Sequence, residues 1–192
     1  MTSGPADGQS GMGKIISNFF ISLDGVVEAP DQWHFEYFDD EMGAVIGAGM
    51  ETTGAALMGR VLYSEWSEYW TRNEDTEGFG PFINEIPKYV VSNSLTDPTW
   101  NNTTVVPGSE AVERLQALKA EVSGDITMSG SPTTVRWLLS EGLLDELHLL
   151  VHPVAVNQGD RLFHQGAPKV PLELLSSHTL GSGVLNLEYA PA

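Results

Sequence analysis

The sequence predicts an α/β fold in which helices flank a mostly parallel central sheet and an antiparallel ribbon completes the C-terminus. Short apolar or β-branched runs alternate with segments of helical pattern over most of the chain, which is typical of a parallel sheet covered on both faces. From Glu146 onward, strand-like runs follow one another with little helix between them, which favours antiparallel pairing. The 192 residues and the apolar fraction of 41% suit one domain of this kind.

The strands expected in the first part of the chain are short and rich in Ile, Val, Phe or Leu. They are Lys14–Ile21, Ala55–Met58, Tyr89–Val91, Thr103–Val106 and Asp125–Met128. The turn pair Asp24-Gly25 follows the first of them and ends it. The expected helices lie between the strands, over Asp40–Met50, Gly59–Trp66, Ser109–Lys119 and Pro132–Glu141.

The helix expected at Pro132 has the best-defined ends. Ser131 is a favourable N-cap, proline suits the first helical position, and Gly142 suits the C-cap. The strands expected after it are Glu146–Val151, Val170–Ser177 and Val184–Tyr189. Gly181-Ser182-Gly183 is a hairpin-type turn, so we expect the last two strands to form the antiparallel ribbon.

Composition limits the setting in which this chain works. Residues 1–12 are rich in Gly, Ser, Pro and Asp and hold no apolar stretch, so we expect a disordered tail followed by one domain over 13–192. The absence of cysteine excludes disulfides and thiolate metal ligands, and it agrees with a cytoplasmic setting. No apolar run reaches the ~20 residues that a membrane-spanning helix needs.

The charge of the chain is strongly negative. Nine Lys and Arg residues against 26 Asp and Glu give a net charge of −17. We therefore expect no nucleic acid and no anionic membrane among its partners, because both are polyanions that such a surface repels. A small anionic cofactor remains compatible, since one helix N-terminus and one or two arginines create a local positive site.

Two strand-to-helix junctions have the features of an anion site. In the first, Gly59 and Arg60 place a flexible backbone and a guanidinium at the start of a helix. In the second, Gly130 permits a ligand to approach the backbone and Ser131 adds a hydroxyl. Helix N-termini at the carboxyl ends of parallel strands bind phosphate through their N–H groups. Neither junction matches the Rossmann or P-loop pattern, so an ordinary capped helix remains the alternative for each.

Short motifs spread over nearly all of the chain carry a family resemblance. They are Ser22-Leu23-Asp24-Gly25, Leu57-Met58-Gly59-Arg60, Tyr89-Val90-Val91-Ser92, Gly130-Ser131, Gly142-Leu143-Leu144-Asp145-Glu146-Leu147, His152-Pro153-Val154 and Arg161-Leu162-Phe163. In this order they resemble the dihydrofolate-reductase-like superfamily. They are most similar to stand-alone relatives of the C-terminal reductase domain of bifunctional riboflavin-biosynthesis proteins. The resemblance implies a dihydrofolate-reductase-like fold, NADP as the cofactor and a homodimer.

The resemblance also implies which residues hold the cofactor. They are Gly59, Arg60, Ser92, Asn93, Gly130, Ser131 and Thr133. Arg60 and Ser92 would bind the adenosine 2′-phosphate, for which a guanidinium and a hydroxyl are suitable donors. The junction from Gly130 to Thr133 would hold the pyrophosphate at a helix N-terminus. The glycine-rich stretch that relatives often show after His-Pro-Val reads Val156-Asn157-Gln158-Gly159 here, with one glycine only.

The segment after Asp24-Gly25 is the candidate substrate region. It contains five aromatic or imidazole side chains in six positions, with Trp33, His34 and Phe38 among them. These rings either stack on a flat substrate or form a small separate core that pins the loop, and the pattern leaves both open. Asp24 is the candidate catalytic carboxylate, although Asp-Gly is also a common turn pair. Glu28 is a second carboxylate for substrate binding in the same loop.

These features favour an NADPH-dependent reductase of a small heterocyclic, pterin- or pyrimidine-like, or carbonyl substrate. By resemblance it would be similar to 5-amino-6-(5-phosphoribosylamino)uracil reductase or to dihydrofolate reductase. A non-catalytic nucleotide-binding protein of the same fold is the alternative. The few basic residues argue against folate and against the phosphorylated riboflavin intermediate, although Arg72 and Arg161 are available to bind an anion. No metal site is expected, because His148 and His152 lie four apart on a strand, too far for one ion.

Overall fold

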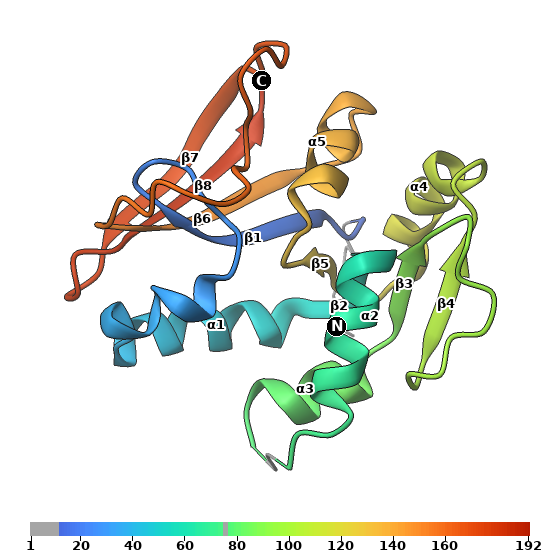
Figure 1. Cartoon of the computed structure of the whole chain (residues 1–192). Helices are drawn as coiled ribbons and strands as arrows, with labels where there is room; N and C mark the ends of the chain where they lie inside the picture. The colour runs from blue at the N-terminus through green and yellow to red at the C-terminus, as the bar shows by residue number, and fades with distance from the viewer. Residues whose placement is uncertain (1–11, 75–76) are drawn as a thin grey trace, which may run out of the picture.

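One sheet of eight strands forms the centre of the computed structural model of this chain (Figure 1). The strands are β1 (Ile15–Ser22), β2 (Thr53–Gly59), β3 (Lys88–Val91), β4 (Thr103–Val106), β5 (Asp125–Met128), β6 (Glu146–His152), β7 (Leu172–Thr179) and β8 (Leu185–Pro191). The structure describes residues 12–74 and 77–192, so the predicted disordered tail lies outside the described residues except for its last position. Each expected strand is present, with bounds that differ by two residues or fewer.

The order of the strands is β4-β3-β2-β5-β1-β6-β8-β7. The first six in this order are parallel, since β3 pairs with β4 and β2, β5 with β2 and β1, and β1 with β6 in parallel register. β8 pairs antiparallel with β6 and with β7. The expected arrangement, a parallel sheet with an antiparallel C-terminal ribbon, is therefore confirmed.

Five α-helices accompany the sheet in the described part of the chain. They are α1 (Asp40–Thr52), α2 (Arg60–Trp70), α3 (Phe79–Glu85), α4 (Ala111–Glu121) and α5 (Pro132–Ser140). The sequence predicts four of them but not α3, whose second and third residues are Gly80 and Pro81. Two short 3₁₀ turns, Pro30–Gln32 and Phe35–Tyr37, lie within the predicted aromatic loop.

Side-chain caps define the start of two helices. Ser131 is the N-cap of α5 as predicted, and its Oγ accepts a hydrogen bond from the N–H of Thr134 at 3.4 Å. Asp39 caps α1 in the same way, since its carboxylate accepts from the N–H of Met42 at 2.8 Å. At the other end of α5, Gly142 lies one residue beyond the C-cap Glu141, with φ of 65°.

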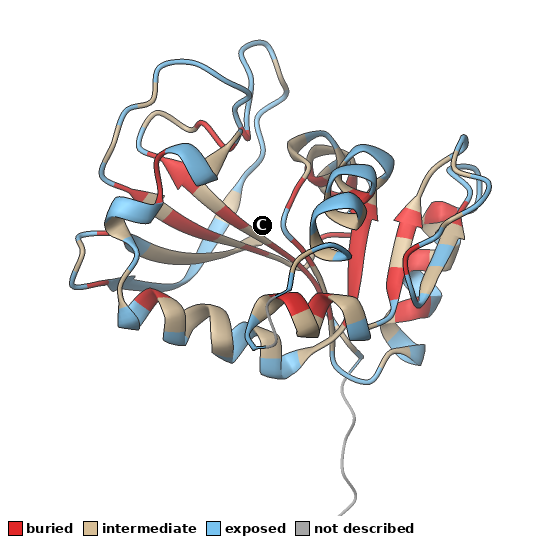
Figure 2. Cartoon of the chain, turned by 60° about the horizontal axis from the view of Figure 1, so that its bottom comes forward, coloured by how far each residue is buried: buried red, intermediate tan, exposed pale blue. Residues whose placement is uncertain are grey.

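The helices cover both faces of the sheet, because alternate strand residues point to opposite sides. Leu57 packs in the cluster that contains Leu115 of α4 and Leu138 of α5. Its neighbours Ala56 and Met58 pack in a second cluster, with side chains of α2 and α3. A third cluster joins α1 to the end of β6 and to the β7–β8 hairpin. Figure 2 shows these buried strand residues running through the middle of the molecule.

The position of β5 creates the ligand edge of the sheet. The chain runs from β1 to β2, β3 and β4 on one side, then returns so that β5 fills the place between β1 and β2. Such a switch in strand order leaves a crevice beyond the carboxyl ends of the strands, where ligands bind in open α/β sheets. The segments that follow β1, β2 and β5 all meet at this edge. Within residues 12–74 and 77–192, no helix combines the length and apolar character that crossing a membrane requires.

Candidate functional site

The two predicted anion junctions lie against each other. A β-carbon built on Gly59, the last residue of β2, would be 2.8 Å from Oγ1 of Thr134 in the first turn of α5. The same hydroxyl is 3.1 Å from Oγ of Ser131. Gly130, with φ of 113°, has a conformation that favours glycine. The N-termini of α2 and α5 therefore open side by side at the carboxyl edge, as an anion site requires.

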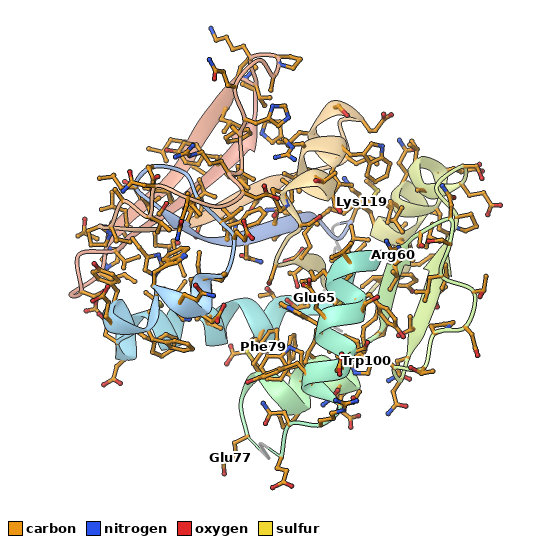
Figure 3. All side chains as sticks on the ribbon, in the orientation of Figure 1. Arg60, Glu65, Glu77, Phe79, Trp100 and Lys119 are labelled. Atoms are coloured by element: carbon orange, nitrogen blue, oxygen red, sulfur yellow. The ribbon has the colours of Figure 1, made fainter. Side chains whose placement is uncertain are left out.

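Arg60 is the first residue of α2 and is exposed. Within the described residues its guanidinium makes no hydrogen bond or ion pair. Figure 3 shows it at the opposite end of α2 from Phe79. Because its positive charge adds to the partial charge of the helix N-terminus, the edge carries a local positive potential on an acidic protein.

Ser92 lies beside Arg60 at this edge. Gly59 of β2 pairs in parallel with Val91 of β3, so the residues that follow each strand leave the sheet at neighbouring positions. The Ser92 hydroxyl oxygen accepts hydrogen bonds from two backbone N–H groups, at 3.1 and 3.0 Å. Its own O–H remains a donor. The structure thus places the two residues of the predicted 2′-phosphate site directly after paired positions of neighbouring strands.

Asn93 and Thr133 are both engaged in contacts within the protein. The side-chain oxygen of Asn93 accepts from the N–H of Gly108 at 2.8 Å, which ties two loops together. Oγ1 of Thr133 accepts from Arg136 at 3.2 Å. Arg136 also donates to the backbone carbonyls of residues 161 and 162, both at 3.1 Å. Arg136 is therefore a residue of this edge that the sequence motifs did not reveal.

Asp24 follows β1 and has both carboxylate oxygens occupied. One oxygen accepts from the Ser22 hydroxyl at 2.7 Å and the Val156 N–H at 2.9 Å. The other accepts from the Asn157 N–H and the Arg161 guanidinium, both at 3.0 Å. The Ser22 hydrogen bond, with these other donors, holds the pKa of Asp24 well below its ordinary value, and burial opposes them only in part. An ionised carboxylate with four donors suits electrostatic positioning and is a poor proton donor at neutral pH.

Glu28 lines a surface hollow of about 320 Å³ beyond the ends of β1 and β6. Its carboxylate accepts from the N–H of Asp160 at 2.7 Å, and its backbone carbonyl accepts from the Trp33 indole at 3.2 Å. The walls of the hollow are Glu28, Ala29, Gln32, Trp33, Val156, Gln158 and Gly159. Two of the predicted substrate residues, Glu28 and Trp33, therefore share one concave site.

His34 belongs to a buried ring cluster. The Phe20 ring stacks on it with centroids 4.5 Å apart and planes inclined by 15°, and Phe35 lies 4.1 Å away. Only 6% of His34 is exposed, so its ring packs in the protein core and offers no open platform to a flat substrate. Phe38, by contrast, is 47% exposed and contacts His34 edge to face at 6.1 Å. His34 therefore belongs to a small core that pins the loop, which is one of the two alternatives. Phe38 is exposed enough to stack on a flat substrate, which is the other alternative.

His152 is a member of this cluster that has no predicted role. It is fully buried at the end of β6, and its Nδ1 donates to the carbonyl of Leu150 at 2.8 Å. The rings of Trp33 and Tyr37 pack edge to face on it, at 5.3 and 5.7 Å. Among the residues that the structure describes, neither its Nε2 nor the Nδ1 of His34 has a hydrogen-bond partner, and both atoms are buried. Burial lowers the pKa of both histidines, so both are neutral at physiological pH.

His148, on β6, contacts a carboxylate. His148 Nε2 lies 2.7 Å from Glu146, which also binds Lys14. Among the described residues, no three His, Cys, Asp or Glu side chains gather as metal ligands would.

Comparisons with known proteins find a similar chain and similar folds. An uncharacterized protein of Bacillus subtilis, YyaP, is 26% identical over 180 residues, which cover 92% of this chain and 94% of that protein. A solved structure from Shewanella sp. PV-4, provisionally named a riboflavin biosynthesis protein, superposes with a TM-score of 0.74 at 20% identity. It covers 93% of this chain and 99% of the other.

Two enzymes share the fold at lower identity. One is a deaminase/5-amino-6-(5-phosphoribosylamino)uracil reductase of Thermotoga maritima, with a TM-score of 0.65 and 11% identity over 94% of this chain and 57% of that chain. The other is the Enterococcus faecalis dihydrofolate reductase complexed with NADP(H), with a TM-score of 0.57 and 15% identity over 93% and 94%. The fold of this chain is therefore dihydrofolate-reductase-like. The RibD C-terminal domain is a reductase domain in homologous proteins, and its family model matches residues 13–186. This chain belongs to the RibD C-terminal domain family.

Proposed function

We propose that this protein is an NADPH-dependent reductase of a small heterocyclic, pterin- or pyrimidine-like, or carbonyl substrate. The observation that carries the proposal is the close approach of Gly59 to Thr134, which brings two helix N-termini together. The guanidinium of Arg60 lies at the first of them and has no partner among the described residues. These residues fit a dinucleotide phosphate group, because backbone N–H groups and a guanidinium are its preferred donors. The family membership supports the same cofactor.

Each part of the edge has a task in this proposal. Arg60 and the Ser92 hydroxyl hold the 2′-phosphate, with Asn93 fixing the adjoining loop. The first turn of α5, which begins at Ser131, holds the pyrophosphate through its N–H groups. Gly59 and Gly130 keep the backbone accessible there. The Thr133 hydroxyl holds the Arg136 guanidinium in place and is not assigned a direct contact with the cofactor. The bound cofactor supplies the hydride that reduces the substrate.

The chain's own residues prepare the substrate side. Asp24 fixes the loop that holds Val156 and Gly159, two walls of the hollow, through its ion pair with Arg161 and its bond to the Val156 N–H. We assign Asp24 this positioning role in place of proton donation. Phe38 and the walls of the hollow exclude water from a flat substrate.

Cofactor binding is the direct test of the proposal. Calorimetry with NADPH and with NADH should show saturable NADPH binding and a raised melting temperature. Arg60→Ala should weaken NADPH binding by about 10- to 100-fold, the cost of losing a charge-assisted hydrogen bond, and should change NADH binding little. Arg72→Ala is the matched control, because Arg72 lies just after the C-terminal end of the same helix and, among the described residues, forms an ion pair with Glu68 alone, at 2.9 Å. The absence of heat with both nucleotides would contradict the proposal.

A nucleotide-binding protein without turnover is the second candidate. The occupied carboxylate of Asp24 favours it, because the predicted catalytic group has no free lone pair. Mixing the protein and NADPH with pterins, pyrimidines and quinones separates the candidates. Substrate-dependent NADPH oxidation supports the reductase, and cofactor binding without oxidation supports the second candidate.

We also propose that the protein is a homodimer and that it works in the cytoplasm. β7 is an edge strand, and Leu174 and Leu175 on it are 51% and 50% exposed. An exposed apolar edge strand favours pairing with a second copy. Light scattering of the wild type and of Leu174→Lys tests this, since the variant should be monomeric.

A further inference from the structure

The positive charges of this protein are almost all used within the chain. All nine Lys and Arg residues lie in the described part of the structure. Five of them pair with carboxylates: Lys14 with Glu146, Arg72 with Glu68, Arg114 with Glu121, Lys119 with Asp145, and Arg161 with Asp24. Arg72 and Arg161, which the sequence alone leaves available to bind an anion, are thus each paired with a carboxylate in the structure.

Two further cations bind backbone carbonyls. Lys88 is fully buried, and its Nζ donates to the carbonyls of Asn84 and Ile86 at 3.2 and 2.8 Å. Arg136 donates to two carbonyls of the 161–162 segment. Both side chains therefore direct their positive charge at carbonyl groups of the chain itself.

The remaining cations are Arg60 and Lys169. Arg60 belongs to the proposed cofactor site. Lys169 lies three residues before β7 begins. In the sheet, Leu174 of β7 pairs with Tyr189 of β8, and Tyr189 pairs with Leu147 near the start of β6. The start of β7, and Lys169 before it, therefore lies at the amino end of β6, which is the opposite end of the strands from the ligand edge.

The substrate side of the ligand edge is acidic instead. Glu28 lines the hollow, and the Arg161 guanidinium of the adjoining loop forms an ion pair with Asp24. The N-terminus of α1 opens at the same edge, but Asp39 already accepts from its Met42 N–H. Asp39 and Glu41 also accept from the N–H groups of residues 182 and 181 in the β7–β8 turn. Backbone N–H groups of the kind that bind a phosphate at other helix N-termini therefore donate here to carboxylates of the chain itself.

We propose that the substrate of this reductase carries no phosphate group and is an uncharged or amine-bearing heterocycle or carbonyl compound. This inference rests on the proposed function and names the substrate class of that site. A phosphate monoester carries about −1.5 to −2 charges at pH 7 and requires charged or amide donors. With Arg60 engaged by the cofactor, such a group would meet no free cation in the described structure and would face Glu28. The phosphorylated aminopyrimidine of riboflavin synthesis is thereby disfavoured.

The first test measures phosphate binding directly. NADPH binding is established by calorimetry beforehand, and its failure would reject the reductase function itself. Ribose 5-phosphate is then titrated into protein saturated with NADP⁺. We expect no saturable binding of ribose 5-phosphate up to about 10 mM, because a Kd above that range is too weak for a specific site. Saturable binding at about 1 mM or below would overturn the inference while leaving the reductase function intact.

The second test adds a cation to the hollow. Gln32 lines the hollow, and Gln116 is an exposed glutamine on α4, so Gln32→Arg and Gln116→Arg are a matched pair. Gln32→Arg should create ribose 5-phosphate binding at least tenfold tighter than in the wild type, because it supplies the missing guanidinium. Gln116→Arg should not. Equal binding by the wild type and Gln32→Arg at sub-millimolar Kd would show that a phosphate site already exists and would reject the inference.

Discussion

The main chain of Gly59 lies so close to Thr134 that a β-carbon at residue 59 would be 2.8 Å from the Thr134 hydroxyl oxygen. This hydroxyl is itself held 3.1 Å from Oγ of Ser131, the N-cap of α5. The end of β2 and the start of α5 are therefore packed without space for a side chain. Since both flank the proposed phosphate site, the glycine sets the spacing of two helix N-termini.

Gly59→Ala should weaken NADPH binding and lower the melting temperature. The methyl group must displace Thr134, whose short side chain cannot bend away as a long one does. Calorimetry and thermal melting measure the two effects. Thr134→Ala in the Gly59→Ala background should restore part of both by removing the contacting oxygen. Gly49→Ala is the control: nothing lies within 4 Å of this exposed position on α1, so it should gain about 0.5–1 kcal/mol of stability.

Loss of the Asp24 carboxylate should loosen the loop that borders the hollow. In Asp24→Asn, the amide nitrogen cannot accept from Asn157 or Arg161, and the ion pair is lost. Hydrogen exchange at the N–H groups of Val156 and Asn157 should become faster. Asp160→Asn in the same loop is the control, because no hydrogen bond is made by its carboxylate within the described residues. Unchanged exchange in Asp24→Asn would show that the loop does not depend on this anchor.

Much of the fold could be predicted because its signals are local. Thr103–Val106 and Asp125–Met128 have the bounds that their β-branched and apolar residues indicate. α3 could not be predicted, because Gly80 and Pro81 are poor helix formers. Its helix is stabilised by the packing of Phe82 and Ile83 against the side chains of α2 and β3 instead.

The site was harder to predict because its contacts join distant parts of the chain. Asp24 and Arg161 are 137 residues apart, and neither residue type alone reveals that they neutralise each other. The contact of Gly59 with Thr134 depends on β5 entering between β1 and β2. Family motifs pointed to residues that the structure places around the proposed cofactor edge, whereas the burial of His34 and the position of Arg136 required the assembled structure.

Acidification should destabilise the protein through His34 and His152. Both have lowered pKa values, so the unfolded chain binds more protons below pH 6.5, and stability falls as the pH decreases from 7 toward 5. Each such proton changes the free energy of unfolding by at most about 1.4 kcal/mol per pH unit. Urea unfolding at several pH values measures this slope. His152→Phe should reduce the slope, whereas His178→Phe, at an exposed position on β7, serves as the matched control.

Alkaline conditions should have the opposite effect through Lys88. Burial lowers the pKa of Lys88 to about 8 from its ordinary value of 10.5, so the unfolded chain binds more protons between these values. The contribution of this residue to stability therefore rises with pH from about 8 to 10.5, by at most about 3 kcal/mol. The difference in free energy of unfolding between the wild type and Lys88→Met should shift in favour of the wild type over this range. Lys169→Met, at an exposed position, should show no such shift, and a flat difference for Lys88→Met would mean that the buried ammonium does not titrate there.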